Sequence, residues 1–254
     1  MEDNKSINYI MDKAKGIELV ICNHSMLSYP VHNHISVYTI GLVTDGYVNV
    51  TINNDLQLCQ KGDIFVIPPY LPHSIQATKE YSMLSLCISR QTLERENYIS
   101  IKEKIIKMLN VITALDNLHL YINDIFQILY DLSLNKGDIH TPMTDIVSGV
   151  REQLELFPEE KISIDEMAQF AFVSKYHFIR NFKQEVGLTP HQFQLQNRIR
   201  KAQRLLHQTD KITEVALDTG FCDQSHFIRQ FEKIVRLTPS KYILACNMLG
   251  THTD

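Results

Sequence analysis

The sequence lacks several patterns that would indicate secretion, membrane insertion or catalysis. No apolar run approaches the roughly 18 residues that a membrane helix needs, and the polar, mixed-charge start is unlike a secretory leader. The five cysteines form no C-x-x-C pair, which fits a reducing cytoplasm better than a disulfide framework or a zinc site. There is no P-loop, G-x-G-x-x-G stretch or Ser/His/Asp arrangement. We therefore expect a cytoplasmic protein with no membrane partner and no bound cofactor.

The chain also has no overall excess of basic residues, because its formal net charge is −4. The charge is unevenly distributed, however. Residues 1–150 hold 11 Lys/Arg and 16 Asp/Glu, whereas residues 151–254 hold 14 and 13. Between Lys175 and Lys241 there are 12 basic and 6 acidic residues. Since local charge decides whether a polyanion can bind, this segment is a candidate nucleic-acid interface.

The first part of the chain has the pattern of β-strands. From about residue 16 to residue 90, short β-branched and aromatic runs such as "SVYTIGLV", "YVNVTI" and "GDIFVIPP" alternate with Gly, Asn, Asp and Pro. Period-two alternation with closely spaced turn residues predicts antiparallel strands in a sandwich or small barrel.

Residues 97–135 change to a helical pattern. Apolar residues recur in steps of three and four in two series, which Asp116-Asn117 separates. The first series is Ile101, Ile105, Met108, Ile112 and Leu115. The second series is Leu118, Ile122, Ile125, Leu129 and Leu132. This spacing predicts two amphipathic helices joined by a tight turn. They could cover the β-domain or form a dimer interface. The segment "NKGDIHTP" at 135–142 is typical of a linker.

The second part contains two similar copies of one sequence segment. "HFIRNFKQEVGLTP" begins at His177 and "HFIRQFEKIVRLTP" at His226, 49 positions later. Each copy follows a related helix, "IDEMA" at 164–168 and "ITEVA" at 212–216. The two units therefore predict a duplicated helix-turn-helix, in which a supporting helix packs on a recognition helix.

Local signals place the ends and faces of these helices. Ser163 with Glu166 forms a capping box, Ser174 and Asp223 are expected N-caps, and Thr189-Pro190 and Thr238-Pro239 begin further helices. The small residues Ala168 and Ala216 suit close helix packing. The pairs Phe178/Phe182 and Phe227/Phe231 predict buried faces, with Arg180 and Arg229 outside. The joining segment 191–207 spans about 25 Å as a helix, close to the separation of successive major-groove segments.

Residues 146–243 resemble the DNA-binding domain of AraC/XylS-type transcriptional regulators. The resemblance rests on "AQRLL", "GFCDQSHFIRQFEK" and the two "LTP" endings. Three departures stand out: Arg236 replaces a glycine that Gly187 keeps in the first copy, Phe172 replaces a smaller turn residue, and Glu232 replaces a common lysine.

The resemblance implies a set of DNA contacts. Residues expected to face bases are Tyr176, Ile179 and Arg180 in the first copy, and Gln224, Ser225, Ile228 and Arg229 in the second. Residues expected to contact phosphates are Lys175, Lys183, Arg198 and Arg200. Arginine pairs bidentately with guanine and glutamine with adenine, so these residue types suit base recognition. Solvated faces or ion pairs within the protein are the alternative roles.

The first part resembles a cupin barrel through "PVHNHISVYTIGLVTDG" and "GDIFVIPPYLPHS". His32, His34 and His73 fall where cupins hold a metal, but Tyr38 and Thr39 occupy the usual glutamate position. Sensor domains of this regulator family generally use no metal. We therefore expect an organic-effector pocket with His32, His34, Tyr38 and His73 as polar anchors. The alternatives are a Zn²⁺ or Fe²⁺ site at the three histidines and a filled, ligand-free barrel. "YTIGLVTDG" and "TPHQFQLQ" resemble regulators encoded beside amino-acid exporters, which points to an amino acid as effector.

The sequence thus predicts an α+β protein with a cupin-like antiparallel β-barrel at 1–96, a helical hairpin and linker at 97–140, and a double helix-turn-helix domain at 141–254. The resemblance implies a transcriptional regulator that is not an enzyme. Its expected partners are double-stranded promoter DNA, a small-molecule effector, a second copy of the chain and, for an activator, RNA polymerase. The alternative is a metal-dependent cupin oxygenase or isomerase with a helical accessory domain.

Overall fold

A computed structural model describes residues 7–12, 16–35, 37–110, 118–134 and 145–247 of the chain. The expected break at Asp116-Asn117 and the expected linker at 135–142 lie outside these residues. The chain divides into two compact units: residues 1–139 together with 245–254, and residues 140–244. Among the described residues, no helix combines the length and the apolar character needed to cross a membrane.

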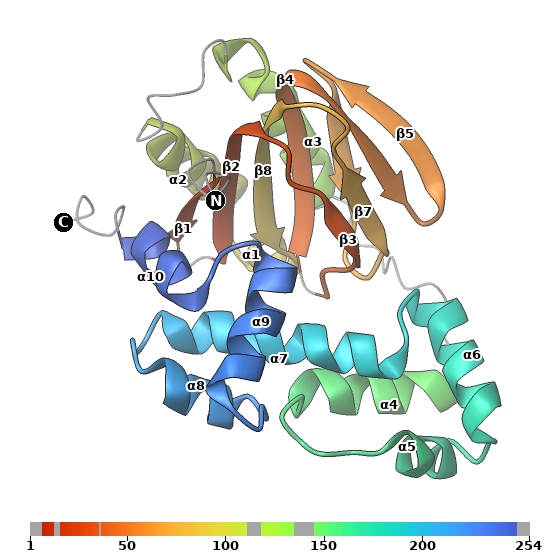
Figure 1. Ribbon diagram of the computed structural model, residues 1–254. Helices are drawn as coiled ribbons and strands as arrows, with labels where there is room; N and C mark the ends of the chain where they lie inside the picture. The colour runs from red at the N-terminus through yellow and green to blue at the C-terminus, as the bar shows by residue number, and fades with distance from the viewer. Residues whose placement is uncertain (1–6, 13–15, 36, 111–117, 135–144, 248–254) are drawn as a thin grey trace. The chain divides into compact units, whose positions relative to one another are not determined.

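The first unit is built on an antiparallel, curled eight-stranded sheet (Figure 1). The strands are β1 (Ile7–Asp12), β2 (Ile17–Ser25), β3 (Tyr29–His32), β4 (Val37–Ile52), β5 (Asp55–Gln60), β6 (Ile64–Ile67), β7 (His73–Gln76) and β8 (Tyr81–Ser89). They follow the order β1-β2-β8-β4-β7-β3, with β5 and β6 also paired to β4. The predicted antiparallel β-domain is confirmed.

The long strand β4 joins the two parts of the sheet. Its first half pairs with β6 and β8 and its second half with β5 and β7. A register shift between Val43 and Asp45 marks a bulge there, and bulges bend the strand that carries them. Before the bulge every residue from Tyr38 to Val43 is buried, whereas after it Val48 and Val50 are buried and their neighbours are not. The sheet is therefore covered on both faces in one half only.

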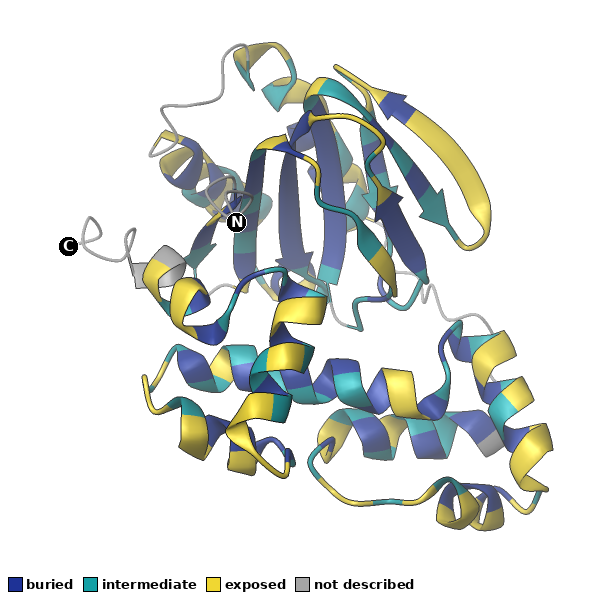
Figure 2. Cartoon of the chain, in the orientation of Figure 1, coloured by how far each residue is buried: buried dark blue, intermediate teal, exposed yellow. Residues whose placement is uncertain are grey.

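Helices cover one face of the β2–β8–β4 region. They are α1 (Arg90–Arg95), α2 (Tyr98–Asn110) and α3 (Ile122–Leu134), preceded by a short 3-10 turn at Leu118–Leu120. Their apolar residues share one buried cluster with alternate residues of the strands, such as Ile40, Leu86 and Ile88 (Figure 2). Both predicted amphipathic helices are present, as α2 and α3, and within this unit they cover the sheet. The last two residues of the first apolar series, Ile112 and Leu115, lie outside the described residues.

The second unit is helical. It contains α4 (Asp145–Leu156), α5 (Ile164–Phe170), α6 (Lys175–Val186), α7 (Pro190–Leu206), α8 (Ile212–Asp218), α9 (Gln224–Val235) and the larger part of α10 (Pro239–Asn247). Helix α5 packs on α6 and α8 packs on α9, while α7 contacts both recognition helices. The structure thus confirms two helix-turn-helix units joined by a long helix.

The helix ends follow the local chemistry of the sequence. Ser163 and Glu166 form the capping box of α5, and the side chains of Ser174 and Asp223 cap α6 and α9. Thr189 caps α7 ahead of Pro190. Each cap satisfies backbone N–H groups that have no partner within the helix, which contributes about 1 kcal/mol of stability.

Candidate nucleic-acid interface and ligand-binding surface

The recognition helices α6 and α9 each present one buried and one exposed face. Phe178 and Phe182 are fully buried in α6, as are Phe227 and Phe231 in α9. Their ring centroids lie 5.7 Å and 5.5 Å apart within each pair. Because residues four apart share a helix face, the phenylalanines fix the orientation of each helix and leave the opposite face outward.

The outward faces carry most of the expected DNA contacts. The exposed ones are Lys175, Tyr176, Arg180 and Lys183 on α6, and Gln224, Ser225 and Arg229 on α9. Ile179 and Ile228 are half-buried. Within the described residues, Arg180, Lys183 and Arg229 have no ion-pair partner. Their charges are therefore available to a polyanion.

Two of these residues have contacts within their own unit. Gln224 accepts a hydrogen bond from the Thr213 hydroxyl at 2.8 Å, which orients its amide and leaves the amide nitrogen as a donor. The Lys175 ammonium pairs with the Asp165 carboxylate at 2.8 Å. The Lys175 charge is thus shared with a carboxylate, so this lysine is a weaker phosphate candidate than Lys183.

Arg198 corrects the sequence-based expectation of a phosphate contact. Its guanidinium donates to the backbone carbonyls of Pro158, Glu159, Glu160 and Gly220, at 2.7 to 3.4 Å. Burial also lowers the pKa of this group. Arg198 therefore ties the segment before α5 and the turn of the second unit to α7, and its donors are used inside the domain.

Arg200 is half-buried and donates to the Asn197 side chain at 2.9 Å. This contact places it within the packing of α7 and not among the fully exposed cations.

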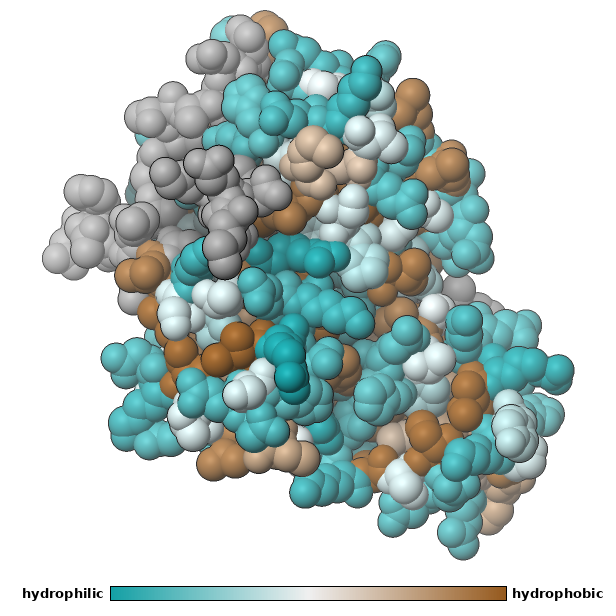
Figure 3. All heavy atoms as spheres, viewed as in Figure 1, coloured by the Kyte–Doolittle hydropathy of each residue, from teal (hydrophilic) through white to brown (hydrophobic). Residues whose placement is uncertain are grey.

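Hydrophilic side chains cover much of the visible surface of the helical unit, with apolar patches between them (Figure 3). The exposed large apolar residues of this unit are Leu156, Phe157, Phe170, Phe172, Tyr176, Leu217 and Leu244.

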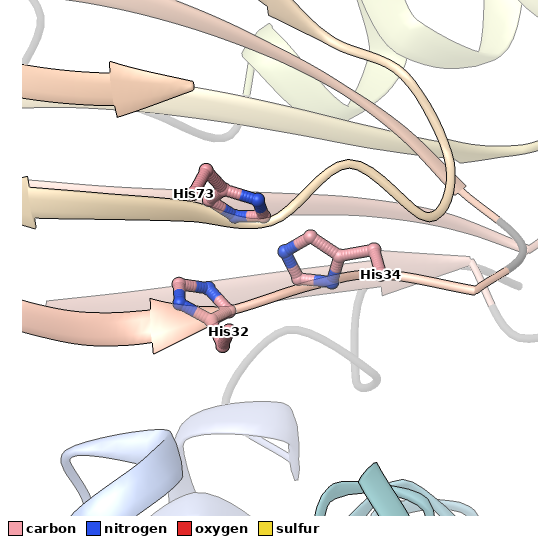
Figure 4. A group of neighbouring side chains, drawn as sticks. All are labelled: His32, His34 and His73. Atoms are coloured by element: carbon pink, nitrogen blue, oxygen red, sulfur yellow. The ribbon is translucent and has the colours of Figure 1, made fainter. Parts of the chain in front are cut away.

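In the first unit, the three expected histidines converge (Figure 4). His32 ends β3, His34 follows it and His73 begins β7, with β3 and β7 paired at His32 and His73. The ring centroids of His32 and His73 lie 4.1 Å apart. One ring nitrogen from each histidine falls within 4.8 Å of the others.

Backbone contacts fix the tautomer of two of these histidines. Nδ1 of His32 lies 2.8 Å from the Pro30 carbonyl and Nδ1 of His73 lies 3.0 Å from the Leu71 carbonyl. A carbonyl only accepts, so Nδ1 of each ring is the donor in these contacts, and in the neutral ring Nε2 holds the lone pair. In a tetrahedral metal site the nitrogen atoms would lie about 3.4 Å apart. The cluster could hold a divalent metal if the rings moved closer, or bind a polar group of an organic ligand.

Tyr38 corrects the expected pocket. It belongs to the buried cluster beneath α2 and α3, on the face of the sheet that these helices cover, and burial raises the pKa of its phenol. Its partner across the strands is Ile88, another member of that cluster. Because side chains alternate along a strand, Tyr38 and the next residue, Thr39, point to opposite faces of the sheet. We call the face that carries Thr39, opposite the one that α2 and α3 cover, the inner face.

The sequence analysis missed a polar row on that inner face. Register pairs Glu18 of β2 with Cys87 of β8, and Cys87 with Thr39 of β4. The Thr39 hydroxyl lies 3.5 Å from the Cys87 sulfur. Burial raises the pKa of Glu18 to about 7 and that of Cys87 to about 12. A lone acid within the apolar strand "IELVIC" was the available signal for this row.

Comparison with known proteins agrees with both units. Residues 15–130 match the family described as AraC-like ligand binding domain, and residues 167–244 match the helix-turn-helix domain family. The uncharacterized HTH-type transcriptional regulator YbfI of Bacillus subtilis (strain 168) is 24% identical over 246 residues, covering 87% of this chain and 89% of that protein. The HTH-type transcriptional regulator MtrA of Neisseria gonorrhoeae is 43% identical over 65 residues, which is 25% of this chain and 22% of that protein.

Among solved structures, ToxT from Vibrio cholerae O395 shares the fold, with a TM-score of 0.57 at 13% identity over 91% of this chain and 98% of that one. A curled antiparallel sheet with a ligand-binding match, together with two matched recognition helices, defines a DNA-binding protein with a ligand-binding domain. The chain belongs to the AraC-type family of DNA-binding transcriptional regulators, with its ligand-binding domain at the N-terminal end.

Proposed function

We propose that the two recognition helices read two adjacent major-groove segments of one promoter site. The observation that carries this proposal is that Arg180 and Arg229 occupy the same position of α6 and α9, both exposed. Joined by the 17-residue helix α7, about 25 Å long, the units suit half-sites about one helical turn apart. Lys183 contacts phosphate in this arrangement.

The test is recovery of genomic DNA fragments on the purified full-length protein, followed by footprinting of the enriched sequence. We expect two protected base clusters about 10 base pairs apart on one face of the duplex. A single protected cluster, or enriched fragments with no shared sequence, would contradict this double reading, in which both recognition helices contact bases of one site.

We propose that the ligand-binding domain binds a small organic effector on the inner face of its sheet. His32, His34 and His73 supply polar anchors there, while Tyr38 belongs to the structural core. An effector regulates DNA binding only if it favours one arrangement of the protein over another. An amino acid remains the effector class that the sequence resemblance suggests. The regulator acts in the cytoplasm, where its promoter lies, and contacts RNA polymerase if it activates.

We also propose that the protein is a homodimer held by residues 97–140. Apolar side chains remain exposed on this segment although α2 and α3 already cover the sheet, namely Ile99, Ile106, Leu120, Tyr130 and Leu134. An exposed apolar set of this kind is typical of association surfaces. Sedimentation should give a dimer mass for the protein and a monomer mass for Ile106→Glu; a monomer in both cases would contradict the dimer.

The proposal assigns no catalysis to the cupin-like domain. The metal-capable group formed by the described residues consists of histidines alone, without the carboxylate that would complete a cupin metal site. Burial raises the pKa of the Cys22 thiol to about 11 and that of Cys87 to about 12, so neither is a thiolate nucleophile near neutral pH. Stoichiometric iron or zinc in the purified protein, together with turnover of any substrate, would contradict this assignment.

A further inference from the structure

The inner face of the sheet carries a compact polar row between strands β2, β8 and β4. Cross-strand pairs place the Glu18, Cys87 and Thr39 side chains next to one another, because paired residues point to the same face. The next row contains Val20, Ser85 and Gly41. A carboxylate and two hydroxyl groups thus come together in the middle of an internal part of the sheet.

This face retains accessible surface that the opposite face has lost. Ser85 and Cys87 are each 9% exposed and Thr39 is 6% exposed, whereas Leu86 and Ile88 on the helix-covered face are 1% and 0% exposed. Glu18 and Val20 are half-buried although β2 lies between β1 and β8. The inner face therefore keeps a little more accessible surface than the helix-covered face of the same strands.

An aromatic ring adjoins the row. Gly41 pairs with Phe65 of β6, and a β-carbon added at Gly41 would lie 2.1 Å from Phe65 Cζ. The glycine thus lets the ring lie directly against the β4 backbone.

Glu18 has no counter-charge within the described part of the chain, where no ion pair or hydrogen bond of its carboxylate occurs. Its cross-strand neighbours are Met11 and Cys87, both uncharged at neutral pH. Burial raises the pKa of the carboxyl to about 7. An unpaired carboxylate that is partly removed from water is costly, and a cation bound beside it offsets that cost.

We propose that the inner face binds a small organic cation, whose ammonium group pairs with the Glu18 carboxylate and donates hydrogen bonds to the Thr39 and Ser85 hydroxyls. This inference rests on the proposed function by naming the chemical class of the effector. The charge of the site selects a cation over an anion, since an anionic group would meet Glu18 unfavourably. A charged donor also makes stronger hydrogen bonds to a carboxylate than a neutral one does.

The inner face extends from this row to the histidine cluster. Cys22 lies two strand positions beyond Val20, on the same face, and its sulfur is 3.9 Å from the Tyr29 hydroxyl. The Tyr29 ring centroid is 6.3 Å from that of His32. Cys22 and Tyr29 thus lie between the polar row and the histidine cluster.

The test is a titration of the isotope-labelled full-length protein, followed by the backbone amide resonances. The probes are butylammonium chloride, 1-butanol and sodium butyrate at equal ionic strength, which match in size and differ in charge. Butylammonium should shift the resonances of Glu18, Thr39, Ser85 and Cys87. The neutral and anionic probes should leave them nearly unchanged.

Glu18→Gln removes the charge while keeping the side-chain shape, and it should weaken butylammonium binding at least about tenfold. Glu103→Gln, at an exposed carboxylate of α2, is the matched control and should bind normally. If Glu18→Gln fails to fold, Glu18→Asp keeps the charge and should retain binding. Equal shifts with 1-butanol, undiminished binding by Glu18→Gln, or no response to butylammonium would each overturn the proposal.

Promoter binding without added cation separates this inference from the proposed function. A protein that binds its promoter site but shows no charge-selective response at Glu18 refutes the cation site alone. A protein that binds butylammonium at Glu18 but recognises no DNA sequence supports the site and refutes the proposed double reading.

Discussion

Gly187 and Arg236 hold the same left-handed backbone conformation at the ends of the two recognition helices. Their φ angles are 79° and 66°, and each N–H donates to the carbonyl four residues earlier, at 2.9 Å. Glycine adopts this conformation without a steric cost, whereas a side chain costs about 1 kcal/mol. The second unit therefore carries strain at a position where the first carries none.

Arg236→Gly should raise the free energy of unfolding by up to about 1 kcal/mol, because it removes this strain. Gly187→Ala should lower it by a similar amount, since it introduces the same strain into α6. Both effects are measured by chemical denaturation of the full-length protein. A clear loss of stability in Arg236→Gly would show that the contacts of the half-buried arginine side chain outweigh its backbone strain.

Phe172 is a second position in the described part of the helical unit where a residue other than glycine holds a positive φ. Its φ is 56°, and its N–H donates to the Gln169 carbonyl. Gly220, with a φ of 81°, takes the corresponding place in the second unit, where its N–H donates to the Leu217 carbonyl. The side chain is 96% exposed, so its removal sacrifices little packing. Phe172→Gly should therefore stabilise the protein by about 1 kcal/mol. Gly220→Ala should destabilise it by more, because the added β-carbon would lie 2.5 Å from the Glu159 carbonyl.

Lys183 and Glu232 occupy equivalent positions with opposite charge. Removing a phosphate contact lowers the dependence of log affinity on log salt by about one unit. Lys183→Ala should therefore weaken binding to all sequences alike and make the salt dependence shallower, and Glu232→Lys should make it steeper. The measurement is DNA affinity across a range of salt concentrations. Unchanged slopes in both variants would count against phosphate contacts at this position.

Glu18 should make stability depend on pH. Burial raises its pKa in the folded state from 4.5 to about 7, so between these values the folded protein binds more protons than the unfolded chain. Its contribution to stability is therefore lost as the pH rises through this window. The advantage of Glu18→Gln over the unsubstituted protein should grow on the order of 2 kcal/mol between pH 5 and pH 8. Denaturation at both pH values would show it; a constant difference would contradict the buried carboxylate.

The sequence predicted the helical unit well because its signals are local. Caps such as Ser174 and Asp223 act within one turn, and the phenylalanine spacing is set by the helix period. Arg198 could not be predicted in the same way, since three of its carbonyl partners, at residues 158–160, lie about 40 positions away in the chain.

The strands of the ligand-binding domain could be predicted from the sequence, but the face of the sheet to which each side chain points was harder to predict. The first half of β4 is buried on both sides, so alternation does not tell which side Tyr38 faces. The convergence of His32, His34 and His73 followed from the resemblance and agrees with the structure. Glu18 was overlooked because a single acid in an apolar strand acquires meaning only when the neighbouring strands show which face it shares.

The most direct test of the double reading compares Arg180→Ala and Arg229→Ala on the promoter site, with Arg95→Ala of the ligand-binding unit as control. Each recognition-helix variant should lose about 1–3 kcal/mol of binding free energy and relax the base preference at its own position. The two affected positions should lie about 10 base pairs apart, and Arg95→Ala should bind normally. Equal losses on the promoter and on random DNA, or relaxed preference at one shared position, would contradict the account.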